Sequence, residues 1–345
     1  MYLFSFGTRP EIIKQFPLIN EFKKRGIPYE TLFTSQHKDL IDKFSNLIDE
    51  PTYILDGIFK KEQSLNFLVS KLRKKTESII SKNNERKIMF QVDTSSAFSV
   101  GLAGFQNHNK IIHLEAGLRT YNLKSPFPEE ANRSLISKIA DIHLCPTENA
   151  FLNLKNEGVS NNVYNVGNTI VDSFKFIAES KLYSSQIENL VDSKKNYLVC
   201  TLHRRENREK MIDLWDELNI VSQNRNIVYI KHPSIKGSEH YLSKEITQIE
   251  PLSYQDMVYL INNSDGVISD SGGIQEEVIS AKKNILICRD TTERPETINS
   301  GYGMLVDKNI SKNIKFLENK NQSVKNPYGK NVSSKIADIV EKIYG

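Results

Sequence analysis

Short apolar runs alternate with helix-like segments along almost the whole chain, and the alternation occurs in two series. The first series predicts strands at 2–6, 29–34, 87–92, 110–114 and 142–145. The second series predicts strands at 197–202, 227–231, 266–269 and 285–288. These runs are apolar throughout, which is typical of parallel strands covered on both faces. The pattern therefore predicts an α/β fold with two parallel-sheet domains.

The intervening segments complete this picture. They predict helices at 65–82, 95–105, 208–222, 254–262 and 273–281. We place the domain boundary near VGNTIVDS, so that residues 1–168 form the first domain and 169–330 the second. The final segment, 331–345, has apolar residues at helical spacing, and we expect it to pack back on the first domain.

Composition excludes several classes of function. The net charge is +4 over 345 residues and the lysines are scattered, so we expect no nucleic-acid partner. No apolar run is long enough to span a membrane. Cys145, Cys200 and Cys288 lie far apart, without metal-ligand or redox spacing, so we expect no metal site. Reduced thiols of this kind fit a cytoplasmic protein.

Charged motifs follow six of the predicted strands at their carboxyl ends. These motifs are GTRPEIIK (7–14), DTSS (93–96), HLEAGLRTYNLKSPFPEEANR (113–133), HRREN (203–207), DSGGIQEE (270–277) and RDTTERPE (289–296). Any one of them reads equally well as an ordinary polar loop. Parallel sheets bind their ligands at this edge, so six motifs together predict a ligand site.

The motif DSGGIQEE indicates how a phosphate group would be held. Ser271 is placed to cap a helix, and Gly272 and Gly273 let backbone amides approach a phosphate or diphosphate. The alternative is a capped helix after a tight turn, without a ligand. Glu277 lies one turn into the helix, where it could bind ribose hydroxyls, whereas we interpret Glu276 as a favourable charge near the helix start. Neither a dinucleotide-binding nor a P-loop motif is present.

Cations lie in the same group of motifs. A diphosphate could be neutralised by Arg9, Lys14, Arg204, Arg205, Arg289 and Arg294, although most surface cations are simply solvated. Arg9 is a stronger candidate than the others because it lies between a strand and a helix that begins with proline.

Acids and a histidine from separate motifs suit proton transfer. Asp93, Glu115 and Glu129 come from three loops, and crowded carboxylates raise one another's pKa values. His203 directly follows a strand and could transfer a proton or bind phosphate. We interpret His113, inside a strand, as structural. Glu130 is expected to have a pairing role, and Arg119 and Arg133 are expected to hold the charged loop by salt bridges.

Taken together, the motifs resemble those of the non-hydrolysing UDP-N-acetylglucosamine 2-epimerases. The matching stretches are GTRPEIIK, HLEAGLRT, PFPEEANR, VGNT, TLHRREN, DSGGIQEE and RDTTERPE, in family order from residue 7 to residue 296. The resemblance implies a GT-B type fold, in which two Rossmann-like domains face a cleft that holds the UDP-sugar and a C-terminal helix crosses back. It also implies a cytoplasmic homodimer that needs no metal or nicotinamide cofactor.

The resemblance further implies an isomerase that interconverts UDP-GlcNAc and UDP-ManNAc. UDP leaves by anti elimination, 2-acetamidoglucal forms, and UDP adds back to give the C2 epimer for surface polysaccharide synthesis. By motif position, the catalytic residues are Asp93, Glu115, Glu129 and His203. By the same criterion, the residues that bind the UDP-sugar are Arg9, Lys14, Arg204, Ser271, Gly272, Gly273, Glu277 and Arg294.

Departures from the family pattern keep alternatives open, and Met257, where the family tends to have an aromatic residue, is one of them. Val92 replaces the usual glycine before Asp93, and the pattern around 231–233 is altered. Many members bind a second UDP-GlcNAc as an allosteric activator; Gln36 and His37 are retained from that region, but the flanking sequence, QHKDL, differs. The alternatives are a GT-B glycosyltransferase, a hydrolysing epimerase, an epimerase of a related UDP-2-acetamido sugar, and a catalytically inactive UDP-sugar sensor.

Overall fold

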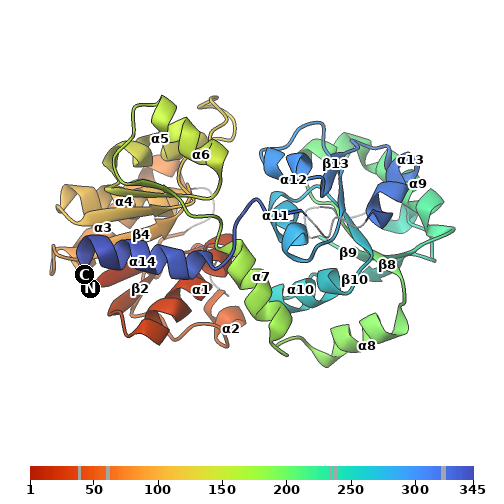
Figure 1. Ribbon diagram of the computed structural model, residues 1–345, viewed down its shortest axis with the longest axis horizontal. Coiled ribbons are helices and arrows are strands. Elements are labelled where there is room, and N and C mark those ends of the chain that lie inside the picture. The colour runs from red at the N-terminus through yellow and green to blue at the C-terminus, as the bar shows by residue number, and fades with distance from the viewer. Residues whose placement is uncertain (38–39, 60–62, 233–234, 236–238, 320–323) are drawn as a thin grey trace. The chain divides into compact units, whose positions relative to one another are not determined.

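The computed structural model forms two compact units (Figure 1). It describes residues 1–37, 40–59, 63–232, 235, 239–319 and 324–345, apart from the side chains of 205 and 239. The first unit comprises Met1–Ser173 and Tyr328–Gly345, and the second comprises Phe174–Pro327.

The first unit is built on a seven-stranded sheet in the order β3-β2-β1-β4-β5-β6-β7. Every neighbouring pair in it is parallel. The strands are β1 (Tyr2–Phe6), β2 (Tyr29–Phe33), β3 (Tyr53–Ile54), β4 (Lys87–Gln91), β5 (Lys110–Leu114), β6 (Ile142–Cys145) and β7 (Val163–Asn165). All their carboxyl ends therefore lie at one edge, which is where the charged motifs begin.

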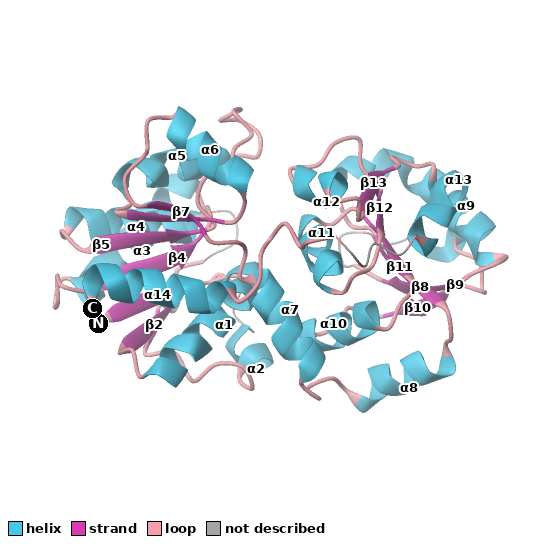
Figure 2. Cartoon of the chain, in the orientation of Figure 1, coloured by secondary structure: helices cyan, strands magenta, loops and turns pink. Residues whose placement is uncertain are grey.

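Helices cover both faces of this sheet (Figure 2). They are α1 (Arg9–Arg25), α2 (Leu40–Phe44), α3 (Leu65–Ile80), α4 (Ser95–Gln106), α5 (Glu129–Ile139), α6 (Glu148–Asn156) and α14 (Val332–Tyr344). Alternate residues of β1 face different helices, as strand geometry requires. Tyr2 and Phe4 pack edge-on against Phe22 of α1, whereas Leu3 shares a buried cluster with Leu72 of α3 and Val100 of α4.

The last helix, α14, packs on α1, as the sequence predicts. Arg25 at the end of α1 donates to Asp338 at 2.6 Å and to Glu341 at 2.8 Å. The Tyr2 hydroxyl donates to the carbonyl of Val340 at 3.1 Å. The chain enters the second unit through α7 (Ile170–Glu179).

The second unit has a six-stranded parallel sheet in the order β10-β9-β8-β11-β12-β13. The strands are β8 (Tyr197–Thr201), β9 (Asn226–Ile230), β10 (Thr247–Ile249), β11 (Gly266–Ser269), β12 (Ile285–Ile287) and β13 (Gly303–Leu305). The helices are α8 (Ser185–Ser193), α9 (Met211–Ser222), α10 (Tyr254–Asn262), α11 (Gly272–Ser280), α12 (Pro295–Asn299) and α13 (Ile310–Asn313), with 3₁₀ turns at Arg205–Lys210, Glu239–Tyr241 and Ile314–Glu318.

Alternation of side chains also places the core of the second unit. Leu198 and Cys200 of β8 pack into the cluster around Trp215 of α9. On the other face, the Tyr197 hydroxyl donates to the carbonyl of Leu260 in α10 at 2.7 Å. All three cysteines are buried and unbridged.

Each strand predicted from the sequence is present, to within about one residue at its ends. Four strands were not predicted: β3, β7, β10 and β13. These four are the edge strands of the two sheets. Each has only two or three residues, which is too short for a pattern to form.

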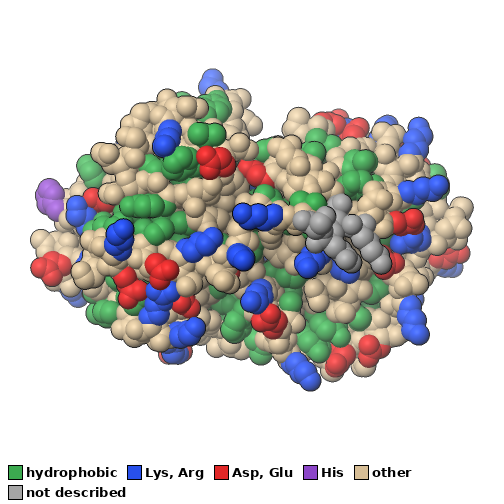
Figure 3. Space-filling model, in the orientation of Figure 1, with side chains coloured by type: hydrophobic (Ala, Val, Ile, Leu, Met, Phe, Trp, Pro, Cys, Tyr) green, Lys and Arg blue, Asp and Glu red, His purple; other side chains and the backbone are tan. Residues whose placement is uncertain are grey.

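On the face drawn in Figure 3, basic and acidic side chains are interspersed.

Candidate functional site

The candidate residues of the first unit come from three neighbouring strand ends. Because β4 pairs in parallel with both β1 and β5, the segments that follow these strands lie side by side. Arg9 follows β1, Asp93 follows β4 and Glu115 follows β5. Lys14 lies one turn further along α1, and Glu129 begins α5.

Glu115 is a buried carboxylate surrounded by hydrogen-bond donors. Lys14 Nζ lies 2.7 Å from its Oε1 and 2.8 Å from its Oε2. Gln91 Nε2 donates to Oε2 at 2.5 Å and Asn168 Nδ2 donates to Oε1 at 3.2 Å. These donors hold the ionised carboxylate in one position, as charge-assisted hydrogen bonds do. Lys14, which the sequence suggested for phosphate binding, is thus an ion-pair partner of a candidate catalytic acid.

Asp93 is suited to exchange a proton near neutral pH. Burial raises its pKa from 3.8 to about 6; Arg133 opposes this rise, and the charges of Glu115 and Glu129 add to it. Arg133 Nε donates to Asp93 Oδ2 at 2.5 Å. A pKa near the working pH is what general acid–base catalysis favours.

Glu129 differs from the other two acids because it is only partly buried. Among the residues that the structure describes, no hydrogen bond to its carboxylate is found. Its neighbour Glu130 is buried and accepts from the backbone of Tyr121 and from Arg133, each at 3.0 Å. Glu130 therefore has the pairing role predicted for it, and the Glu129 carboxylate is left available to a ligand.

The two arginines of the charged loop have different partners. Arg133 bridges Asp93 and Glu130, as expected of a residue that holds this loop. Arg119 instead pairs with Glu157, just after α6, at 2.6 Å and donates to Ser137 at 2.7 Å. Arg119 thus fixes the loop to the neighbouring helices and does not pair with the candidate acids.

Glu11 connects two strand-end motifs and was not singled out from the sequence. Its Oε2 accepts from the backbone of Gly7 and Thr8 at 2.8 Å, and its Oε1 accepts from the Thr94 hydroxyl at 2.6 Å. Burial raises the pKa of Glu11. The spacing from Thr8 to Glu11 is that of a capping box, which is the signal that could have found it.

Gln36 and His37, which the family resemblance linked to allosteric binding, make contacts within the first unit. Gln36 accepts from the Ser96 hydroxyl at 2.9 Å. His37 Nδ1 accepts from the backbone of Arg9 at 3.2 Å. Burial, with the charges of Lys43 and Arg9, lowers the pKa of His37. Residues 38, 39 and 233 of the altered patterns lie outside the described residues.

His203 in the second unit is positioned by a buried aspartate that sequence reasoning missed. Asp270 follows β11 and is fully buried. It accepts from the backbone of His203 at 3.0 Å, from the backbone of Arg204 at 2.9 Å and from Asn207 Nδ2 at 2.9 Å. The His203 ring stacks on His232, with centroids 4.7 Å apart. Burial lowers the pKa of His203 although the charge of Asp270 opposes this, so a neutral imidazole is favoured at pH 7.

The start of α11 offers backbone amides to an anion. Ser271 is the N-cap residue, but its hydroxyl makes no capping hydrogen bond. Among the described residues, and apart from the backbone of its own helix, a Cβ added to Gly273 would meet no atom within 4 Å, whereas one added to Gly272 would lie 3.1 Å from Glu293 Oε1. Open space in front of a helix N-terminus is the geometry that phosphates use.

Arginines gather beside this helix start, each paired with a carboxylate. Arg204 lies 3.2 Å and Arg289 2.6 Å from Glu293, and Arg294 Nε lies 2.5 Å from Glu276. Burial alone would raise the pKa of Glu293, but Arg294 and Arg289 lower it to about 2. These pairs hold the arginines in place, and Glu293 is a further residue that sequence reasoning missed. Glu277 is buried in the same helix.

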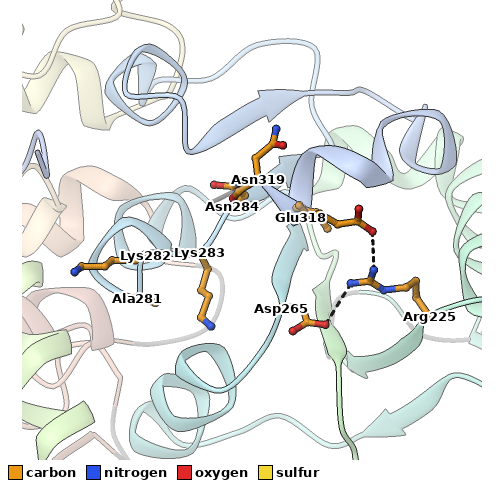
Figure 4. A pocket seen from close by; sticks show the side chains of 9 residues that line it. Arg225, Asp265, Ala281, Lys282, Lys283, Asn284, Glu318 and Asn319 are labelled. Carbon is orange, nitrogen blue, oxygen red and sulfur yellow. Dashed lines mark hydrogen bonds and ion pairs between the residues drawn. The ribbon is translucent and has the colours of Figure 1, made fainter. Parts of the chain in front are cut away.

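The cavity in Figure 4 lies elsewhere in the second unit. Its volume is about 740 Å³. The residues that line it include Asp265 and Asn284, which directly precede β11 and β12. Arg225 lies between Asp265 at 3.3 Å and Glu318 at 2.8 Å. The cavity is therefore at the amino ends of the strands, opposite to the edge that carries the candidate residues.

The described residues contain neither a candidate membrane span nor a candidate metal-ligand group. None of their helices is long and apolar enough to cross a membrane. In the same part of the chain, no three His, Cys, Asp or Glu side chains are grouped so that they could hold a metal ion.

Comparison with known proteins gives the family. The sequence model of the UDP-N-acetylglucosamine 2-epimerase family matches residues 20–341. The chain belongs to this family. UDP-N-acetylglucosamine 2-epimerases from Salmonella borreze and Campylobacter jejuni are 37% and 34% identical to it; the first match covers 96% of both chains, and the second covers 95% of this chain and 93% of the relative.

Solved structures of other members share the fold. A putative UDP-N-acetylglucosamine 2-epimerase from Listeria monocytogenes has a TM-score of 0.89 at 32% identity, covering 99% of this chain and 96% of its own. The UDP-GlcNAc 2-epimerase from Neisseria meningitidis, solved with UDP-GlcNAc bound, has a TM-score of 0.85 at 32% identity and covers 99% of both chains. The resemblance and the GT-B type fold class predicted from the sequence are confirmed, and this epimerase is an isomerase by reaction class.

Proposed function

We propose that this epimerase interconverts UDP-GlcNAc and UDP-ManNAc by inverting C2 of the sugar. Relatives named UDP-N-acetylglucosamine 2-epimerase, one of them solved with UDP-GlcNAc bound, support this substrate. The observation that carries the proposal is the group of three acids in the first unit. Burial raises the pKa of Asp93 to about 6, and the negative charges of Glu115 and Glu129 contribute to this rise.

In the first step, one carboxylate removes the proton from C2. The electron pair of the C2–H bond forms the C1–C2 double bond, the bond from C1 to the diphosphate oxygen breaks, and UDP leaves with that electron pair. In UDP-GlcNAc the C2 hydrogen and the UDP group are anti to each other, and the product of elimination is 2-acetamidoglucal. Asp93, Glu115 and Glu129 are proposed to supply the acid–base groups.

The second step reverses the chemistry on the other face of C2. A protonated carboxyl group delivers a proton to that face, and a diphosphate oxygen of UDP bonds to C1. Two acid–base groups are needed because the proton leaves from one face and returns to the other. A carboxyl group with a pKa near neutrality can serve in either direction, since it is partly protonated at the working pH.

The second unit is proposed to hold UDP throughout. The amides of Gly272 and Gly273 at the start of α11 would bind the diphosphate, together with the Ser271 hydroxyl, since the Ser271 amide already donates to Ser269 Oγ at 3.0 Å. Arg204 and Arg294 would balance its charge. From the family resemblance, Arg9 is also proposed to bind the UDP-sugar, and Lys14 would act through Glu115. The buried Glu277 would bind the ribose hydroxyls.

His203 would donate a hydrogen bond to the diphosphate from its neutral ring. A departing UDP must stay bound because the same molecule adds back to the glucal. Elimination and re-addition are together redox-neutral, so the proposed reaction uses no nicotinamide cofactor.

The family also suggests wider properties that we propose for this chain. They are a homodimer, a cytoplasmic location, a product used for surface polysaccharide and an activating second UDP-GlcNAc. Light scattering after size-exclusion chromatography tests the dimer. The activator is tested by following the reverse reaction from UDP-ManNAc: a lag that a trace of UDP-GlcNAc removes indicates activation, and linear progress from the start indicates none.

The deciding experiment is incubation with UDP-GlcNAc in D₂O, followed by proton NMR. UDP-ManNAc with deuterium at C2 is the expected product. Free ManNAc and UDP would instead identify a hydrolysing enzyme. Absence of any change, with traces of UDP and UDP-ManNAc also present, would reject UDP-GlcNAc as the substrate and favour a related sugar or a binding protein.

A further inference from the structure

Val92 adopts a backbone conformation that its side chain disfavours. Its φ angle is 57°, in the left-handed region, where a β-branched residue is a marked exception. This position directly precedes Asp93. A glycine here would adopt the same angle without steric cost, so in this chain other contacts must hold the backbone.

Two hydrogen bonds from β5 hold the Val92 peptide groups. The Val92 N–H donates to the carbonyl of Leu114 at 3.1 Å. The Val92 carbonyl, which belongs to the peptide bond joining Val92 to Asp93, accepts from His113 Nε2 at 2.7 Å. A carbonyl can only accept, so Nε2 of His113 carries a proton. Through this hydrogen bond, the side chain of His113 fixes the peptide group that directly precedes Asp93.

His113 is suited to this role because it stays neutral. Its side chain is buried beside the ring of Phe90, and His143, Arg119 and the acid Glu115 act on it electrostatically. Burial and the neighbouring His143 lower the pKa of His113 to about 3. Among the described residues its Nδ1 has no hydrogen-bond partner. A second proton there would be unsatisfied, so the Nε2–H tautomer persists across the working pH range.

We propose that His113 is a positioning residue for Asp93, fixing the strained Val92–Asp93 peptide so that the carboxyl group keeps its place beside Arg133. This inference rests on the proposed function, in which Asp93 is an acid–base group. The other anchor is Asn132 Nδ2, which donates to the Asp93 carbonyl at 2.8 Å. Without His113, the carboxyl group would be free to move relative to Arg133, Glu115 and Glu129, the charged groups that face it.

The experiment compares two amide substitutions of the same residue. The side-chain nitrogen of glutamine reaches about as far as Nε2 of histidine, whereas that of asparagine stops near Nδ1. We expect His113→Gln to keep kcat close to the wild-type value. We expect His113→Asn to lower kcat about 10- to 100-fold with little change in KM, because a displaced acid–base group weakens the chemical step and not binding. If His113→Asn does not fold, His113→Phe takes its place.

A second readout separates positioning from loss of stability and does not depend on turnover. The pKa of the Asp93 carboxyl group can be followed by carbon NMR in protein labelled with ¹³C-aspartate, with Asp93→Asn to assign the signal. Loosening the contact with Arg133 is expected to raise this pKa by about half a unit or more in His113→Asn. The apparent pKa in the pH profile of kcat that reports Asp93 should rise as well.

Several results would overturn the proposal. One is a His113→Asn protein with a lower melting temperature but unchanged kcat and unchanged Asp93 pKa. Another is a His113→Gln protein whose kcat is as low as that of His113→Asn. A third is the failure of every variant to fold. Either result would leave His113 with a structural role only. If the wild-type protein does not epimerise UDP-GlcNAc, the proposed function fails, while the NMR comparison still decides whether His113 positions Asp93.

Discussion

Lys14 and Glu115 form a buried ion pair between residues 101 positions apart, with Nζ 2.7 and 2.8 Å from the two carboxylate oxygens. Their side chains are only 9% and 2% exposed. A buried pair of this kind is costly to break, because the remaining partner becomes an uncompensated charge. One candidate catalytic acid is thus also part of the structural framework, and another, the partly exposed Glu129, is not.

This contrast predicts different outcomes for two equivalent substitutions. Glu115→Gln should abolish most turnover and lower the free energy of unfolding by about 3 kcal/mol, since it leaves the Lys14 ammonium buried without its counter-charge. Glu129→Gln should also abolish most turnover but change the free energy of unfolding by less than about 0.5 kcal/mol. Initial rates and urea unfolding followed by circular dichroism give both quantities.

Trp215 fluorescence would be the wrong probe for this test. The only tryptophan of the chain lies in the second unit, whereas both substitutions are in the first. Equal stability of the two variants would contradict the structural role of the ion pair. Near-normal turnover in either variant would remove that residue from the chemical step.

The raised pKa of Asp93 predicts a pH dependence of stability. Between its ordinary value of 3.8 and its folded value of about 6, the folded protein keeps a proton that the unfolded chain has released. The stability contributed by this group is therefore fully present below pH 3.8 and is lost as the pH rises through about 6. The loss amounts to about 3 kcal/mol at pH 7, taking 1.36 kcal/mol per pKa unit.

Asp93→Asn tests this dependence because it cannot ionise. Relative to the wild-type protein, its free energy of unfolding should increase with pH from about 4 to about 6 and then level off. Turnover should be lost, so this variant would be more stable and less active at neutral pH. Urea unfolding of both proteins at a series of pH values measures the difference. A difference independent of pH would show that the folded pKa of Asp93 is not raised.

The sequence predicts the architecture well because the interior strands are long and wholly apolar. It also predicts which strand ends carry charge, since parallel strands share one carboxyl edge. It misses the short edge strands, and it misses contacts that depend on distant segments. Two such contacts are the hydrogen bond from the His203 backbone to Asp270 and the hydrogen bond from the Thr94 hydroxyl to Glu11. Lys14 shows the same limit: its charge is visible in the sequence, but its partner Glu115 is not.

Gly273 should reveal whether the start of α11 binds the diphosphate. Gly273→Ala adds a methyl group that meets no described atom outside the backbone of its own helix within 4 Å, so the fold should gain up to about 0.5 kcal/mol from the better helix former. The same methyl group would occupy the space that a phosphate needs, and the Kd for UDP should rise about tenfold or more. Calorimetric titration with UDP and thermal unfolding measure the two effects. Unchanged UDP affinity would place the diphosphate elsewhere.

At position 92, the glycine variant should be more stable than the alanine variant, which is the reverse of the usual order of stability. Both Val92→Ala and Val92→Gly remove the outer atoms of the side chain, but only alanine keeps a Cβ in the left-handed conformation at φ 57°. That Cβ costs about 1–2 kcal/mol, more than the extra chain entropy of glycine, so Val92→Gly should be the more stable by about 1 kcal/mol. Lys74, exposed within α3, is the matched control, and there alanine should be more stable than glycine by about 1 kcal/mol. Urea unfolding of the four variants measures both differences, and the same order at both positions would mean that Val92 is not held in the left-handed region.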